Sequence, residues 1–190
     1  MWETMTETER YVRRYLKETL ANVQASPIAR MRNGLTVFEK TLIYYYTATG
    51  YRTINSTLRR PKGKRGTKAG MLLSAALEKL PDWRGLAYRN AFLTKKDIAR
   101  YRASMDAGSS VVEYSFISCS RSPGKAANYP HANTEFRILS MHGKSVEDYS
   151  CLGTHHPPNE EEILIPPGHA FRVLDVNDSG PMVLIILREL

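Results

Sequence analysis

The sequence of 190 residues has little cysteine and no long apolar run. Its two cysteines, Cys119 and Cys151, are too few for a disulfide framework; a reducing compartment is the simpler assumption, with one bridge left open. The longest apolar stretch, 182–187, falls far short of the ~18 residues that a membrane span needs. Residues 1–7 lack a basic segment followed by an apolar one, so no secretory signal is visible. A domain cut from a longer precursor, or export without such a signal, stays open.

Internal repeats and low-complexity segments are also missing. With 42% hydrophobic and 24% charged residues, the chain is expected to form one globular domain over residues 1–190. Lysine and arginine outnumber aspartate and glutamate by 27 to 19, which gives a net charge of +8. Much of this charge lies in residues 59–68, where proline and glycine predict a loop. This basic loop could dock an acidic partner protein or a phosphate-rich ligand, or it is simply solvated; without interleaved aromatic residues, nucleic acid is an unlikely partner.

Hydrophobic periodicity predicts helices in the first part of the chain and strands in the second. The helices are expected from Thr6 to about Val23 and over 35–47, 51–58 and 68–80. The strands are expected over residues 85–89, 111–118, 136–141, 163–165, 171–176 and 182–187. Helices first and strands later favour an α+β fold.

Two glutamates, Glu160 and Glu162, stand at i and i+2 just before the apolar run 163–165. Alternate side chains of a strand share a face, so both carboxylates are expected to project the same way at one strand edge. Two carboxylates held together stabilise developing positive charge, and different environments divide base and electrostatic roles between them. On this motif alone, a solvated acidic turn stays open.

Three short motifs follow one another along the chain, each at the end or the start of a predicted strand. Tyr88-Arg89 ends one predicted strand, 118–120 (Ser-Cys-Ser) ends the next, and 160–162 (Glu-Glu-Glu) enters a later one. This order resembles the mono-ADP-ribosyltransferases of the cholera toxin, clostridial binary toxin and arginine-specific ecto-enzyme type, whose signature is aromatic-Arg, Ser-Thr-Ser and Glu-x-Glu. Further segments resemble that family at residues 51–59, 143–150 and 162–173, so the resemblance covers roughly residues 36–190.

The resemblance implies a fold. It is an ADP-ribosyltransferase-like split antiparallel β-sandwich with N-terminal helices around an NAD cleft. Residues 1–35 would be a helical extension and 36–190 the catalytic core. Two positions depart from the pattern. Cys119 replaces a threonine and is expected to point away from the site, and Asn90 stands where the family commonly has glycine.

The resemblance also implies roles. Glu162 would stabilise the oxocarbenium-like centre formed from NAD, Glu160 would orient or deprotonate the acceptor, Ser118 would fix Glu162, and Arg89 would hold the pyrophosphate. Besides Arg89, the residues expected to contact NAD are Tyr88, Asn90, Phe116, Ser118 and Ser120. Residues 121–130 would cover the bound NAD. Target recognition would fall to residues 151–159, and within them to His155, His156 and Asn159. Either loop could instead be a plain connector.

The implied activity is transfer of ADP-ribose from NAD to an arginine of a target protein, with release of nicotinamide. A glutamate at position 160 goes with arginine acceptors in this family. The expected setting is a bacterial effector or toxin, secreted without a classical signal peptide and acting in the host cytosol. Two alternatives are an NAD glycohydrolase, in which water is the acceptor, and a catalytically silent adaptor. The set Arg89, Ser118, Glu160 and Glu162 counts against the adaptor.

Metal binding is not expected. All five histidines lie between His131 and His169, but their spacing matches no zinc motif.

Overall fold

The computed structural model describes residues 5–32, 34–60, 66–126 and 131–190. The chain forms two compact units. Residues 1–81 and 146–159 make up the helical unit, and residues 82–145 and 160–190 make up the sheet unit. Helices in one unit and a mostly antiparallel sheet in the other confirm the α+β prediction. The prediction of one domain, with an extension over residues 1–35, stays a prediction.

The helical unit begins with a break that its sequence does not signal. Where one helix is predicted, the structure has α1 (Glu7–Tyr15) and α2 (Lys17–Ala25). The Thr6 hydroxyl accepts the Glu9 N–H at 3.1 Å, as the capping motif predicts. Leu16 then leaves the helical region, with φ −127° and ψ 37°. Leucine is a good helix former, so tertiary packing overrides local propensity at this position. The side chain is buried in the core of α1, α2, α3 and α5, which contains Val12, Leu16, Leu20, Leu42 and Leu72.

The remaining helices of this unit follow the predicted positions closely. A 3₁₀ turn, η1 (Pro27–Arg30), precedes α3 (Val37–Tyr45), and α5 (Lys68–Leu77) comes last. Between α3 and α5, a π-helical turn, η2 (Tyr46–Gly50), joins α3 directly to α4 (Tyr51–Arg59). A larger residue at this join would displace the Tyr45 ring, because a Cβ on Gly50 would lie 2.4 Å from its Cε1. Among the described residues, no helix is long and apolar enough to cross a membrane.

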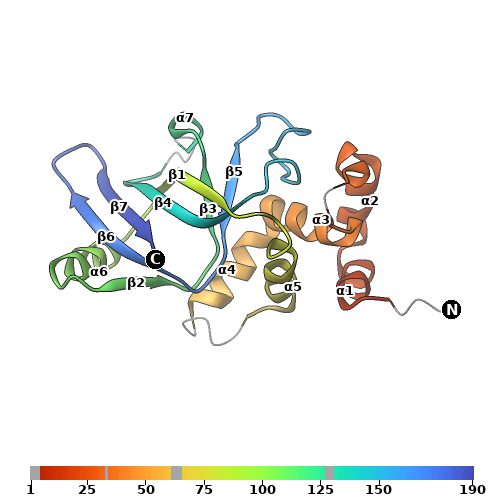
Figure 1. Cartoon of the computed structure of the whole chain (residues 1–190), viewed down its shortest axis with the longest axis horizontal. Helices are drawn as coiled ribbons and strands as arrows, with labels where there is room; N and C mark the ends of the chain where they lie inside the picture. The colour runs from red at the N-terminus through yellow and green to blue at the C-terminus, as the bar shows by residue number, and fades with distance from the viewer. Residues whose placement is uncertain (1–4, 33, 61–65, 127–130) are drawn as a thin grey trace. The chain divides into compact units, whose positions relative to one another are not determined.

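The described residues of the sheet unit form one seven-stranded sheet (Figure 1). Its strands are β1 (Trp83–Ala91), β2 (Ser110–Glu113), β3 (Ile117–Ser120), β4 (Thr134–Ser145), β5 (Glu162–Ile165), β6 (His169–Asn177) and β7 (Val183–Glu189). The strand order is β1-β3-β5-β4-β7-β6-β2, and β1 also pairs along β4. Only the β4–β7 pairing is parallel among those described. Strands β1, β3, β5 and β4 therefore close on one another, and β7, β6 and β2 extend the sheet beyond β4, in agreement with the expected split fold.

Two features of the sheet unit differ from the predictions. The single strand predicted over residues 111–118 is two strands, because β2 pairs with β6 whereas β3 pairs with β5. The predictions also missed α6 (Lys95–Asp106), which packs against β2 and β6. Its capping box, in which Thr94 and Asp97 bond reciprocally, was visible in the sequence. The loop predicted over 121–130 contains a short helix, α7 (Pro123–Ala126), and residues 127–130 lie outside the described ranges.

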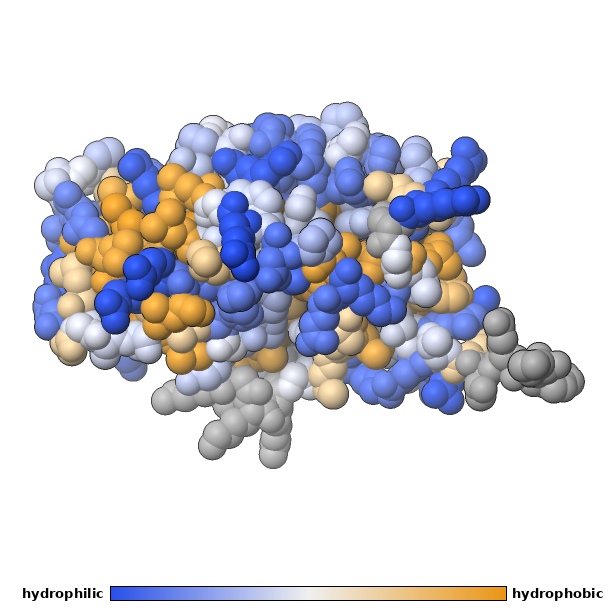
Figure 2. Space-filling view, in the orientation of Figure 1, coloured by the Kyte–Doolittle hydropathy of each residue, from blue (hydrophilic) through white to orange (hydrophobic). Residues whose placement is uncertain are grey.

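The two faces of the sheet differ in how far their apolar side chains are buried. On one face, Leu86 and Leu139 lie directly opposite each other and are 39% and 40% exposed, and Met141 and Leu174 are exposed as well. Figure 2 shows apolar side chains gathered over these strands and interrupted by hydrophilic ones. The other face carries the core of the sheet unit, whose fully buried members include Ala87, Ile163, Ile165, Phe171 and Ile185.

A buried carboxylate fastens the end of β7 to β4. The side chain of Glu189 has no exposed surface. Its Oε2 accepts the Ser140 hydroxyl at 2.8 Å and the N–H groups of Met141 and His142 at 2.6 and 3.0 Å. His169 Nδ1 lies 2.6 Å from the other oxygen. Burial alone would raise the pKa of Glu189, but the bonds from His169, His142, Met141 and Ser140 outweigh it and lower the pKa to about 2.

We expect Glu189→Ala to lower the free energy of unfolding at neutral pH by about 3 kcal/mol, because buried donors lose their acceptor. A carboxylate with a lowered pKa stabilises the fold above its unfolded pKa, and this contribution is lost as the pH falls toward the folded value. The difference between wild type and variant should therefore shrink as the pH falls from 4.5 toward about 2. Urea titrations across this pH range measure it. Glu135→Ala, which removes an exposed ion pair with Arg137, is the control. An equal loss in both variants would contradict the expectation.

Candidate active site

The polar motif residues meet in one row across three strands of the sheet unit. Tyr88 on β1 lies directly opposite Ser120 on β3, and Ser120 lies directly opposite Glu162 on β5. Residues directly opposite in an antiparallel pair have their side chains on the same face. The three motifs that are far apart in the sequence are thus neighbours in the sheet, as their order along the chain predicts.

Glu162 is a buried carboxylate with a fixed partner. The residue is 5% exposed, and its Oε1 accepts the Ser118 hydroxyl at 2.7 Å. A buried carboxylate needs such a donor, and a hydrogen bond to an ionised acceptor is among the stronger kinds. The predicted contact between Ser118 and Glu162 is therefore present, whereas the catalytic role of each residue stays a prediction.

Arg89 reaches the same point from β1. Its Nη1 donates to the backbone carbonyl of Ser118 at 2.7 Å, and the side chain is half-buried. This bond uses one of the five N–H donors of the guanidinium, so the fork retains donors for a phosphate. Arg89 was expected to hold the NAD pyrophosphate; the structure shows in addition that it ties β1 to β3 beside Glu162.

The two carboxylates of the Glu-x-Glu motif are not placed by strand alternation. Glu162 is the first residue of β5, but Glu161 has a φ of 51° and Glu160 precedes the strand. The prediction that strand alternation places Glu160 and Glu162 on one face is therefore wrong. Glu160 is half-buried, and burial raises its pKa. The two carboxylates thus differ in environment, as a division of roles between them requires.

Cys119 points away from the polar row. It is 5% exposed and belongs to the core of the sheet unit, opposite Ile163. Burial, the largest effect, raises the pKa of its thiol to about 12. The thiol is therefore neutral at pH 7 and is not a nucleophile. The expectation that the middle residue of 118–120 turns into the core is confirmed.

The other residues expected to contact NAD are placed less clearly. Asn90 is half-buried on β1 and lies opposite Glu135 on β4. Phe116, between β2 and β3, is only 1% exposed. Tyr88 and Ser120 lie in the polar row described above. The NAD contacts of these four residues stay predictions.

The segment expected to recognise the target belongs to the helical unit and is folded on itself. The Thr154 N–H donates to the Glu147 carbonyl at 3.1 Å, and Asn159 Nδ2 donates to Glu147 Oε1 at 2.6 Å. Gly153 allows this close turn, because a Cβ there would lie 1.8 Å from the Glu147 carbonyl oxygen. His156 packs edge-on against Tyr44. The segment is thus an ordered loop; the recognition roles of His155, His156 and Asn159 stay predictions.

Ser122 and Lys125 lie in the segment 121–130 that was expected to cover NAD, but neither of them, nor Glu161, was given an individual role. The Ser122 hydroxyl donates to Glu161 Oε2 at 2.5 Å, and Lys125 Nζ lies 3.1 Å from Glu161 Oε1. No local signal announces the positive φ of Glu161, since such backbone favours glycine or asparagine. Glu161 directly precedes Glu162, and the Ser122 N–H donates to the Ser120 hydroxyl at 3.0 Å, so these two residues adjoin the polar row.

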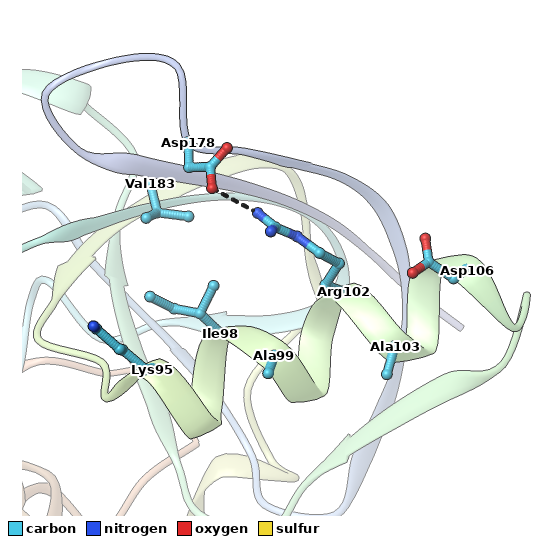
Figure 3. A pocket seen from close by; sticks show the side chains of 8 residues that line it. All are labelled: Lys95, Ile98, Ala99, Arg102, Ala103, Asp106, Asp178 and Val183. Carbon is cyan, nitrogen blue, oxygen red and sulfur yellow. Dashed lines mark hydrogen bonds and ion pairs between the residues drawn. The ribbon is translucent and has the colours of Figure 1, made fainter.

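A separate groove of about 510 Å³ runs along α6 (Figure 3). An ion pair between Arg102 of α6 and Asp178 of the β6–β7 turn crosses it, with Nη2 and Oδ2 3.0 Å apart. None of the predicted site residues lines it; the lining residues are Lys95, Ile98, Ala99, Arg102, Ala103, Asp106, Asp178 and Val183. Within the described residues, no group of three or more histidine, cysteine, aspartate or glutamate side chains is arranged to hold a metal.

The fold and the polar row define a family. The sequence profile described as ADP-ribosyltransferase exoenzyme matches residues 21–187, and the chain belongs to that family. NAD is the substrate of ADP-ribosyltransferases. The profile begins inside the segment 1–35 that the sequence assigned to an extension.

Individual relatives agree with this assignment. A protein of Mycobacterium avium (strain 104), whose name provisionally assigns it as an NAD(+)–arginine ADP-ribosyltransferase, is 35% identical over 132 residues. The match covers 68% of this chain but only 15% of that much longer protein.

Solved structures show the same fold. Exoenzyme S of Pseudomonas aeruginosa, in complex with human 14-3-3 protein beta and carba-NAD, has a TM-score of 0.72 at 20% identity, covering 96% of this chain and 86% of that one. The ADP-ribosyltransferase Vis of Vibrio splendidus, in complex with agmatine, has a TM-score of 0.65 at 20% identity, covering 99% and 88%. At this identity the likeness concerns the fold alone.

We expect Ser118→Ala to lower the rate of NAD cleavage by roughly 10- to 100-fold, because Glu162 loses the donor that fixes its carboxylate. The affinity for NAD should change by less than about threefold, since the Arg89 bond to the Ser118 carbonyl does not involve the hydroxyl. Nicotinamide release and NAD titration measure the two effects. Ser110→Ala, at the exposed start of β2, is the matched control. Equal rates in wild type and Ser118→Ala would contradict the positioning of Glu162 by Ser118.

Proposed function

We propose that this protein is an NAD-dependent mono-ADP-ribosyltransferase that modifies an arginine of a target protein. The observation that carries the proposal is the buried Glu162 carboxylate, fixed by the hydroxyl of Ser118, whose backbone carbonyl accepts a hydrogen bond from Arg89. A preorganised carboxylate is what cleavage of a glycosidic bond that develops positive charge requires. Family membership supports NAD as the source of that bond.

The proposed reaction exchanges one bond for another. The bond between the ribose C1′ and the nicotinamide nitrogen breaks, and its electron pair leaves with nicotinamide. Glu162 stabilises the resulting oxocarbenium-like centre and accepts a hydrogen bond from a ribose hydroxyl. A nitrogen of the acceptor guanidinium attacks C1′, and its proton passes to Glu160. Arg89 holds the pyrophosphate through the donors that the Ser118 carbonyl does not use.

Burial of Glu160 supports its assignment as the base. The raised pKa makes this carboxylate a stronger base than an exposed glutamate, which suits proton removal from an acceptor. Glu162 is assigned the electrostatic role because it is held by a serine donor inside the sheet. The environments of the two carboxylates therefore support a base role for Glu160 and an electrostatic role for Glu162.

The acceptor and the setting are supported by the relatives. The name of the Mycobacterium avium protein specifies arginine, and Vis was solved with agmatine, which carries a guanidinium group. Exoenzyme S was solved with a human protein. We therefore propose a bacterial effector or toxin that acts on a protein inside a host cell. The basic loop 59–68 is proposed to dock an acidic part of that target, although residues 61–65 lie outside the described ranges.

The experiment follows labelled NAD with wild type, Glu162→Ala and Glu160→Gln. We expect wild type to label agmatine and protein through a linkage that neutral hydroxylamine releases. Glu162→Ala should lower both NAD cleavage and transfer by about 100-fold or more. Glu160→Gln should lose transfer but keep NAD cleavage, because the acceptor loses its base. Consumption of NAD by wild type without labelled acceptor would replace the proposal with a glycohydrolase. NAD that neither binds nor is consumed would favour the silent adaptor.

A pH profile tests the role of Glu160 separately. As a base it acts when deprotonated, and its pKa lies above the ordinary 4.5. We expect the ratio of transfer to NAD hydrolysis to be low at acidic pH and to rise as the pH passes through this raised pKa. In Glu160→Gln the ratio should be low and flat. A wild-type ratio that does not change between about pH 4 and pH 8 would contradict the base assignment.

A further inference from the structure

Glu161 has a backbone conformation that its side chain does not favour. Its φ of 51° lies in the left-handed region, where the Cβ of a residue other than glycine crowds the carbonyl oxygen. Among the described residues, it is the one such residue that is not glycine. A conformation of this kind persists only where the surroundings hold it.

Three contacts from one neighbouring segment hold Glu161. The Ser122 hydroxyl donates to Oε2 at 2.5 Å, and Lys125 Nζ lies 3.1 Å from Oε1. The backbone N–H of Arg121 donates to the Glu161 carbonyl at 3.1 Å. The hydrogen bond from Ser122, and next that from Lys125, lower the pKa of Glu161, so the side chain is ionised at neutral pH. Both carboxylate oxygens and the backbone are therefore engaged.

The segment that holds Glu161 is itself fixed to the polar row. The Ser122 N–H donates to the Ser120 hydroxyl at 3.0 Å, and Ser120 lies directly opposite Glu162. Arg121 and Ser122 directly follow β3, and Glu161 directly precedes Glu162, the first residue of β5. A change at Glu161 is thus transmitted to Glu160 and Glu162 through a single peptide unit on each side.

We propose that Glu161 is a positioning residue, which sets the direction of Glu160 relative to Glu162 through its bonds to Ser122 and Lys125. The proposal rests on the proposed transferase function. An extended residue at 161 would place the two carboxylates by strand alternation. The left-handed conformation of Glu161 gives the Glu160 and Glu162 side chains different relative directions, and the contacts of Glu161 hold it in that conformation. Glu161 touches no reacting atom in this assignment.

The effect of a Glu161 variant on the two activities distinguishes a positioning role from a general loss of stability. Glu162 alone supports NAD cleavage, whereas transfer needs Glu160 in register with the acceptor. Loss of the Glu161 contacts should therefore lower transfer more than hydrolysis. A variant that is merely less stable would lose both activities in proportion.

The experiment measures agmatine labelling and NAD hydrolysis for three variants. We expect Glu161→Ala to lower the ratio of transfer to hydrolysis by about tenfold, with the KM for NAD changed by less than about threefold. The double variant Ser122→Ala with Lys125→Gln removes the partners and leaves Glu161 unchanged; it should lower the ratio in the same way. Glu161→Gln retains an acceptor for Ser122 and should keep most of the ratio. The melting temperature of each variant is measured alongside.

Asp178→Ala, which removes the exposed ion pair with Arg102, is the control and should leave the ratio unchanged. If wild type transfers ADP-ribose and the ratio is the same in Glu161→Ala, the positioning role is overturned while the proposed function stands. A parallel fall of both activities that follows the melting temperature would overturn it as well. If wild type binds NAD but neither hydrolyses nor transfers it, the proposed function fails, and the positioning role fails with it.

Discussion

The hydrogen bonds of Ser118 are the contacts on which the site depends. Its hydroxyl donates to Glu162 on β5, and its carbonyl accepts from Arg89 on β1. A single residue of the four-residue strand β3 thus joins the anion and the cation of the site. Since a buried carboxylate without a donor is costly, this arrangement both stabilises Glu162 in the fold and fixes its rotamer.

The two faces of β3 explain how so short a strand serves both packing and chemistry. On one face, Cys119 packs into the core opposite Ile163. On the other face lie Ser120, which belongs to the polar row, and Ser118, whose hydroxyl donates to Glu162. The alternation of a strand assigns each residue to one face, so a change of the middle residue from threonine to cysteine leaves the polar face intact. The buried Glu189 anchors the end of β7 to β4 in the same sheet.

The contact between Ser118 and Glu162 was predicted because the family resemblance is carried by short motifs at strand ends, whereas the roles of these residues stay predictions. The family resemblance carried by the motifs of Arg89, Ser118 and Glu162 implied that these residues lie together. The break at Leu16 and the left-handed Glu161 were not predicted, since both conformations arise from tertiary contacts of residues with no local preference for them. The division of residues 111–118 into two strands depends on partners distant in the sequence. Helix α6 is a different case: its capping pair, Thr94 and Asp97, was readable in the sequence but was overlooked.

The unit that holds the site differs from the unit that holds the expected recognition loop. Glu160 and Glu162 belong to the sheet unit, whereas residues 146–159 belong to the helical unit. The boundary falls between Asn159 and Glu160, directly before the Glu-x-Glu motif. The contacts of Glu161 therefore fix the first residues of the sheet unit after this boundary, where the direction of Glu160 is decided.

The most direct test is a crystal structure of the wild-type protein with carba-NAD, an analogue that resists cleavage. We expect the ring carbon that bears nicotinamide to lie against the Glu162 carboxylate, with Ser118 still bonded to Glu162 and Arg89 on the pyrophosphate. Binding of carba-NAD in the groove along α6, or anywhere else away from Glu162 and Arg89, would contradict the assignment of the site.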